Sequence, residues 1–230
     1  MFLVDKDPKS IAAESYRVLR TSLEYSSVDK ELKSIVITSS EPGEGKSTIA
    51  GNLASIIAQN NKKVIIIDCD LRRPTIHKKF DISNSIGLTE YIIGKNDLNN
   101  VIQVLNENFS VITSGRIPPN PSEILSSKSM ENLLKALGIC YDYVILDTPP
   151  LRAVTDAQVL AGKCDGTILV VRAESTSKDS IIKAYKELEK VRANVLGAVL
   201  NGIKGNNKSY YYYNEKNKEK NNKKKVKVRA

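Results

Sequence analysis

The 230-residue sequence has no tryptophan, one histidine and three cysteines, and its apolar runs are short. A membrane-spanning helix needs roughly 20 apolar residues, whereas a run such as Val64 to Ile67 has the length of a buried strand. Residues 1–10 lack the basic region and apolar stretch of a secretory signal, so we expect a cytoplasmic protein. The cysteines show no CxxC spacing, which argues against a disulfide framework and against a zinc site.

Most of the chain has little net charge, and the excess of positive charge lies at its end. The formal net charge is +9, but nine lysines or arginines against two glutamates between Lys208 and Ala230 contribute +7, which leaves +2 for residues 1–207. From residue 206 the sequence is rich in Asn and Lys, with few apolar residues besides four tyrosines. Such a composition predicts a disordered, flexible basic tail over 206–230. A purely solvating tail explains this charge as well as an arm for nucleic acid or anionic membranes does, and we do not expect nucleic acid as a partner.

The rest of the chain alternates between helix-like and strand-like patterns. We expect strands at 34–38, 64–68, 109–113, 143–147, 167–171 and 195–200, and helices at 46–58, 123–137 and 177–191, among others. Apolar strands that alternate with amphipathic helices favour a parallel sheet covered on both faces. The prediction is a doubly wound, mostly parallel α/β domain over residues 1–205, with ligands at the carboxyl ends of its strands.

An amphipathic helix is predicted over about 10–25, before the first strand. One face carries apolar and small residues, namely Ile11, Ser15, Val18, Leu19, Ser22 and Leu23. Glu14, Arg17 and Arg20 lie around the other face, and their spacing alone favours a solvated, salt-bridged surface.

The strand at 34–38 runs into a glycine-containing loop that opens a helix, which is the context of a P-loop. Its glycines turn successive N–H groups toward phosphate oxygens, its lysine reaches the β- and γ-phosphates, and its serine hydroxyl binds Mg²⁺. Ser40 stands where the general pattern has its first glycine. The sequence therefore predicts a site for ATP and Mg²⁺, formed by Gly43, Glu44, Gly45, Lys46, Ser47 and Thr48.

Two further strands end in carboxylates. Asp68 and Asp70 close the strand at 64–68, and Asp147 closes the strand at 143–147. An aspartate after a strand is common on its own, but three at one edge beside a P-loop predict a phosphoryl-transfer site. Asp68 and Asp147 would hold Mg²⁺ with Ser47, and Asp68, or else Asp70, would accept the proton of the attacking hydroxyl.

These motifs resemble those of the bacterial tyrosine kinases of capsule and exopolysaccharide synthesis. Members of that family carry a Walker A motif, a second motif ending in Asp-x-Asp, a Walker B acid and a C-terminal tyrosine cluster. The resemblance implies that Lys46, Asp68, Asp70 and Asp147 are catalytic. It also implies that the phosphate acceptors are Tyr210, Tyr211, Tyr212 and Tyr213.

The same resemblance carries expectations about partners. It implies that Glu14, Arg17 and Arg20 make subunit contacts in a ring-like homo-oligomer whose members phosphorylate one another's tails in trans. It implies other tyrosine-containing protein substrates, and a separate transmembrane adaptor that brings the protein to the inner face of the membrane. Related ATPases use an Asn after the last strand to read adenine, and Asn201 holds that place.

The alternative is a partitioning or cell-division ATPase switch of the same superfamily. Those proteins place a lysine near the start of the P-loop that reaches across a dimer, and the matching position here is Glu41. An acid there would repel a partner's phosphates. The tyrosine cluster also has no purpose in such a switch, so the kinase interpretation is favoured.

Overall fold

The computed structural model describes residues 2–26 and 31–203. The predicted tail, with Tyr210 to Tyr213, and the predicted domain boundary at 205 lie outside these residues. The described residues form a sheet of seven strands in the order β3-β4-β2-β5-β1-β6-β7. The strands are β1 (Ser34–Ser39), β2 (Val64–Asp68), β3 (Ile102–Asn106), β4 (Phe109–Ile112), β5 (Tyr143–Asp147), β6 (Gly166–Arg172) and β7 (Val195–Asn201).

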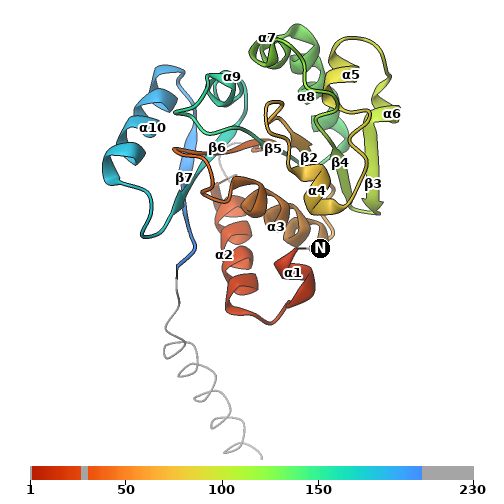
Figure 1. The fold of residues 1–230 in the computed structure, drawn as a ribbon. Coiled ribbons are helices and arrows are strands. Elements are labelled where there is room, and N and C mark those ends of the chain that lie inside the picture. The colour runs from red at the N-terminus through yellow and green to blue at the C-terminus, as the bar shows by residue number, and fades with distance from the viewer. Residues whose placement is uncertain (1, 27–30, 204–230) are drawn as a thin grey trace, which may run out of the picture.

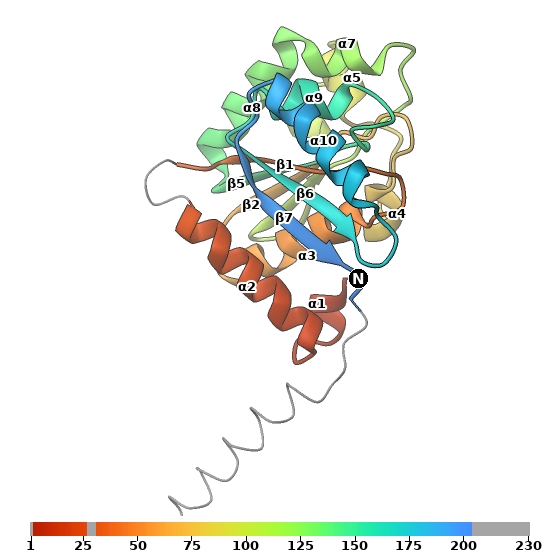
Figure 2. The same cartoon turned by 90° about the vertical axis from the view of Figure 1, so that its left-hand side faces the viewer.

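Helices cover both faces of this sheet, as predicted, and Figure 1 shows the three layers. One face carries α1 (Leu3–Lys6), α2 (Ile11–Ser26), α3 (Lys46–Gln59) and α4 (Ile76–Phe80). The other carries α5 (Leu88–Ile92), α6 (Leu98–Val101), α7 (Pro121–Ser126), α8 (Lys128–Cys140), α9 (Asp156–Ala161) and α10 (Lys178–Lys190). The arrowheads of β6 and β7 point to the same side in Figure 2, which is the side that faces the viewer in Figure 1.

Alternation along the strands builds a core on each side of the sheet. On β1, Ile35 and Ile37 pack with α2 and α3, while Val36 packs on the opposite side with residues of α5 and α8. All five residues of β2 and of β5 are buried, as expected for central parallel strands. Burial on both faces fixes the register, so the carboxyl ends of β1, β2 and β5 are held at one edge of the sheet.

The sequence interpretation differs from the structure at two places in the upper half of the fold. β3 was not predicted, and it pairs antiparallel with β4 at the edge of an otherwise parallel sheet. The single helix expected over 123–137 is two helices, because Ser127 takes an extended conformation with ψ of 157°. Its side chain accepts a hydrogen bond from Met130 N at 3.2 Å, and this cap starts α8.

The predicted apolar face of the N-terminal helix is right for Leu19 and Leu23 and wrong for Ile11 and Val18. Ile11 and Val18 are 42% and 59% exposed, although both were assigned to the buried face. The helix packs through Leu19 and Leu23, as expected, and also through buried Ala13 and through Tyr16, which were not expected on that face. The small side chain of Ala13 lets α2 approach the core closely, and its weak hydrophobicity did not predict this contact. As a result, α2 presents an apolar stripe away from its own domain.

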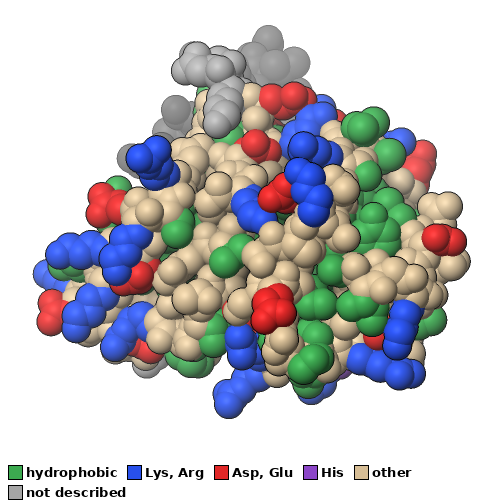
Figure 3. Space-filling model, turned by 90° about the horizontal axis from the view of Figure 1, so that it is seen from above, with side chains coloured by type: hydrophobic (Ala, Val, Ile, Leu, Met, Phe, Trp, Pro, Cys, Tyr) green, Lys and Arg blue, Asp and Glu red, His purple; other side chains and the backbone are tan. Residues whose placement is uncertain are grey.

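The surface over the upper helices mixes charges of both signs. Figure 3 shows Lys and Arg next to Asp and Glu there, with hydrophobic side chains gathered on the side where Figure 1 places α5. Among the described residues, no helix combines the length and apolar character that crossing a bilayer requires.

Candidate active site

The P-loop joins β1 to α3, as predicted, and its glycines are required by the backbone. Gly43 and Gly45 have φ of +79° and +98°, in the left-handed region that side chains other than glycine rarely adopt. A Cβ on Gly45 would also lie 2.1 Å from Asn201 Nδ2. The loop therefore depends on glycine for both its conformation and the close approach of Asn201.

Glu44 explains why Ser40 can replace the first glycine of the motif. The Glu44 carboxylate is buried and folds back over the loop. The Ser40 hydroxyl donates to both of its oxygens at 3.2 Å, and the Glu41 N–H donates at 3.0 Å. The Thr176 hydroxyl donates to it as well. Ser40 thus supplies a hydrogen bond that glycine could not, and it helps to hold the loop in shape.

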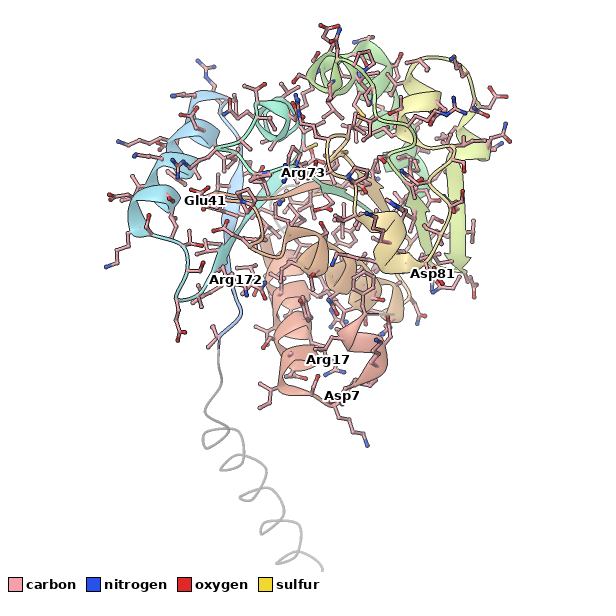
Figure 4. All side chains as sticks on the ribbon, in the orientation of Figure 1. Asp7, Arg17, Glu41, Arg73, Asp81 and Arg172 are labelled. Atoms are coloured by element: carbon pink, nitrogen blue, oxygen red, sulfur yellow. The ribbon has the colours of Figure 1, made fainter. Side chains whose placement is uncertain are left out.

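Two residues from the last two strands support the outer side of the loop. Arg172 Nη1 donates to the Gly43 carbonyl at 3.0 Å, and Asn201 Nδ2 donates to the Glu44 carbonyl at 2.9 Å. Figure 4 labels Arg172 and Glu41 on this side of the site. Asn201, the expected adenine reader, is therefore placed against the P-loop itself.

Glu41 is held within its own chain. Its carboxylate forms an ion pair with Arg152 and accepts a hydrogen bond from Ser180 Oγ at 3.2 Å. An acid fixed in this way offers no cation to a partner's nucleotide, which agrees with the argument against a sandwich-dimer switch.

A cavity of about 570 Å³ opens in front of the loop. Lys46, Ser47 and Asp70 are among the polar residues of its lining, and Pro149 and Val154 are among the apolar ones. The volume lies within the range of small-molecule sites. Lys46 is only 8% exposed, so its charge acts in a partly dehydrated environment.

The sheet register places two of the predicted aspartates beside each other. Asp68 pairs with Asp147 across β2 and β5, and Ile37 of β1 pairs with Asp147 from the other side. Asp68 is buried, and backbone N–H groups of Asp70, Thr75 and Ile76 donate to its oxygens at 3.0 to 3.2 Å. Burial, with the charge of Asp147 as a second cause, raises the pKa of Asp68 well above its ordinary value.

Asp147 is also buried, but its hydrogen bonding differs from that of Asp68. Among the described residues, neither of its carboxylate oxygens has a hydrogen-bond partner. Burial raises the pKa of Asp147 to about 7, an effect that Ser47 and Lys46 nearby partly oppose. A buried carboxylate without partners is costly and calls for a cation or an ordered water.

These residues fit a magnesium ion of the P-loop type. In the part of the chain that the structure describes, no three His, Cys, Asp or Glu side chains are grouped as metal ligands. Mg²⁺ in such sites is held by the P-loop hydroxyl, phosphate oxygens and water, so a carboxylate cluster is not required. Ser47 and the orphaned oxygens of Asp147 supply what the protein contributes to that arrangement.

Asp70 differs from the other two aspartates because it lines the cavity. Its Oδ1 accepts the Arg73 N–H at 3.0 Å. Burial raises the pKa of Asp70, against the opposing hydrogen bond from Arg73 and the charge of Lys46. Of the two candidates for the base, Asp70 is the one that can face a substrate in the cavity.

The structure adds residues that the sequence interpretation missed. Arg72 binds the fully buried Asp156 through Nε at 2.9 Å and Nη2 at 3.2 Å, and the Ser122 hydroxyl donates to Asp156 at 2.5 Å. Lys79 Nζ donates to the Thr48 hydroxyl at 3.0 Å. Arg72 follows the Asp-x-Asp motif directly, which was a signal that it borders the site. Asp156 lies far away in sequence and no pattern linked the two.

Glu14, Arg17 and Arg20 lie on α2, apart from the cavity. Arg17 Nη1 contacts Glu14 Oε2 at 2.7 Å, and Arg20 Nε lies 3.5 Å from Glu24 Oε1. The Arg20 side chain is 21% exposed, so it turns partly toward the domain and does not join the other two.

Comparisons with known proteins show which family the chain resembles. Residues 32–200 match a family model described as an AAA domain. Tyrosine-protein kinase YwqD of Bacillus subtilis (strain 168) is 48% identical over 86% of this chain and 84% of its own length. The putative tyrosine-protein kinase CapB of Staphylococcus aureus is 41% identical over 91% of this chain and 92% of its own. The solved kinase domain of Escherichia coli tyrosine kinase ETK is 41% identical, with a TM-score of 0.85 over 88% of this chain and 80% of that one.

Proposed function

Since this chain belongs to the bacterial tyrosine-protein kinases of capsule biosynthesis, we propose that it transfers the γ-phosphoryl group of ATP to Tyr210 to Tyr213 of a second copy of itself. The observation that carries this proposal is the cavity at the P-loop that Lys46, Ser47 and Asp70 line together. P-loop N–H groups and Lys46 would bind the phosphates of ATP, and Asn201 at the loop would lie beside its adenine ring.

Ser47 and Asp147 would hold Mg²⁺, which would supply positive charge to the β- and γ-phosphates, while Asp68 would position the loop that follows β2. Asp70 would take the phenolic proton while the tyrosine oxygen forms its bond to the γ-phosphorus and the bond to the ADP oxygen breaks. The proton then rests on Asp70 until product leaves. Its raised pKa brings the carboxylate closer to the pH at which a general base is efficient.

Transfer in trans requires that subunits meet. We propose residues 1–205 as the kinase domain, 206–230 as the acceptor tail, and α2 as the helix of subunit contact in a ring-like assembly. The exposed Ile11 and Val18, next to Glu14 and Arg17, support that use of α2. Recruitment from the cytoplasm to a membrane through a separate adaptor is also proposed. Recovery of the chain only in the soluble fraction of its own host would count against that adaptor.

The test is mass spectrometry of the tail after incubation with Mg–ATP. The wild-type chain should acquire phosphate on Tyr210 to Tyr213, and a folded Lys46→Met variant should acquire none on its own. Mixing Lys46→Met with an active chain that lacks 206–230 should label the former. Tail labelling of Lys46→Met alone would falsify the assigned site, and its absence from the mixture would exclude transfer in trans.

A further inference from the structure

A second hollow of about 560 Å³ adjoins the ATP cavity. Its walls include Arg73, His77, Lys78 and Arg116, and we call it the basic groove. Arg73 and Thr75 line both the groove and the ATP cavity, so the two spaces are neighbours. In Figure 4, Arg73 lies near the middle of the face at the carboxyl ends of the central strands.

The ionisable side chains that line the groove are all basic. Its lining holds two arginines and a lysine and no Asp or Glu, although residues 1–207 carry a net charge of only +2. Within the described ranges, Arg73, Lys78 and Arg116 have no ion-pair partner.

Other arginines around the site are already occupied. Arg72 is bound to Asp156, Arg152 to Glu41, and Arg172 to a P-loop carbonyl. Arg73 and Arg116 differ from these arginines, because neither side chain is engaged by an ion pair among the described residues and both line the basic groove. Unpaired cations that line one groove repel each other in the free protein, and an anionic ligand would relieve that repulsion.

The position of the groove indicates which substrate it serves. Thr75 Oγ1 donates to Ser47 Oγ at 2.9 Å, so the groove begins at the magnesium end of the ATP cavity. The adenine end, beside Asn201, lies on the other side of the P-loop. An anion in the groove would thus be a neighbour of the transferred phosphoryl group, which is where the acceptor peptide must lie.

Two features of the lining suit a carboxylate or a phosphate. The arginine fork binds either group through two parallel hydrogen bonds. His77 adds a ring whose Nδ1 is buried and has no partner among the described residues. The lining thus contains several hydrogen-bond donors and no Asp or Glu side chain.

We propose that the basic groove binds an acidic residue or a phosphotyrosine that flanks the acceptor tyrosine. The proposal rests on the kinase function proposed above, and it names the substrate class of that site. In the tail, four consecutive tyrosines would allow one modified residue to sit in the groove while another enters the ATP cavity. Each transfer then favours the next, against the repulsion between phosphotyrosine and ATP.

The test compares three synthetic peptides of equal length, each with one acceptor tyrosine. The flanking positions carry Gln, Glu or phosphotyrosine. The variant is Lys78→Gln with Arg116→Gln, because these two exposed residues line the groove and not the ATP cavity. The matched control is Lys183→Gln with Lys186→Gln on α10, which removes the same charge from another exposed surface. Circular dichroism melting curves establish that both variants fold.

For the wild-type chain and the control, we expect KM for the phosphotyrosine peptide to be about tenfold lower than for the Gln peptide, with the Glu peptide between them. In the groove variant these differences should shrink to about twofold or less, with KM for ATP and kcat for the Gln peptide unchanged. A lower KM for the phosphotyrosine peptide alone assigns the site to modified tyrosines, and a similar gain for Glu extends it to acidic proteins.

Two results overturn the inference in distinguishable ways. If the wild-type chain phosphorylates all three peptides with one KM, or the phosphotyrosine peptide worst, the groove does not bind substrate although the kinase function stands. If the groove variant and the control lose the preference equally, the effect belongs to overall charge. Phosphorylation of none of the peptides, together with an unlabelled tail, would instead remove the proposed function itself.

Discussion

Replacing the buried Asp147 by Asn should stabilise the nucleotide-free protein and remove its response to Mg–ATP. The carboxylate has no hydrogen-bond partner among the described residues, and its pKa rises from an ordinary 3.8 to about 7. A shift of that size corresponds to about 4 kcal/mol of unfavourable free energy for the ionised form, at about 1.4 kcal/mol per pKa unit. The Asn amide also needs partners, which reduces the expected gain in unfolding free energy to about 1–3 kcal/mol at pH 8.

The gain in unfolding free energy from Asp147→Asn should be larger at high pH than at low pH. Above pH 7 the folded protein carries the full cost of the Asp147 charge, whereas below the ordinary pKa of 3.8 both folded and unfolded forms hold the proton. The advantage of Asp147→Asn should therefore shrink as the pH falls from 8 to 5. This window follows from a folded-state pKa that is higher than the unfolded one.

The assay is urea unfolding followed by circular dichroism at pH 8 and pH 5, with thermal melting in the presence and absence of Mg–ATP. Mg–ATP should raise the melting temperature of the wild-type chain and leave that of Asp147→Asn unchanged. The control is Asp179→Asn, an exposed residue of α10, which should change the unfolding free energy by no more than about 0.5 kcal/mol. An equal gain at both pH values, or no gain at pH 8, would refute the buried charge as its cause.

Two further changes test the subunit contact and the broken helix. Replacing Glu14, Arg17 and Arg20 by Ala should lower the sedimentation coefficient of the assembled protein. The melting curve of the monomer should change little, since surface ion pairs contribute less than about 1 kcal/mol. An unchanged sedimentation profile would show that these residues form a solvated surface and no subunit contact. Ser127→Ala removes the cap that accepts from Met130 N, and urea unfolding should show a loss of about 1 kcal/mol.

The sequence was sufficient where one local signal determines the structure. Central strands such as β2 and β5 are continuous apolar runs that end in aspartate, and their predicted bounds match the structure. The P-loop was recognised because its glycines must adopt positive φ values between a strand and a helix. In these cases the backbone conformation and the burial pattern both require the residue types that the sequence has at these positions.

Other features depend on contacts that no local pattern contains. The break between α7 and α8 depends on Ser127, which caps α8. A serine can either continue a helix or cap the next one, and the local sequence does not distinguish the two. The contact face of α2 was misjudged because Val18 is more hydrophobic than Ala13, although Ala13 is the residue that is buried. The pairing of Arg72 with Asp156 joins residues 84 positions apart and was invisible before the fold was known.

Asp68 lines neither the ATP cavity nor the basic groove, but it positions residues of both. Its carboxylate accepts N–H groups from Asp70, Thr75 and Ile76, and so it fixes the loop that follows β2. That loop presents Asp70 to the cavity, sets the Thr75 hydroxyl on Ser47, and places Arg73 where cavity and groove meet. An Asp at the end of a buried strand can do this because its acceptors reach N–H groups that a turn leaves unpaired. The second aspartate-containing motif is therefore better understood as a frame for two binding spaces, with Asp68 as the positioning residue and Asp70 as the residue that meets substrate.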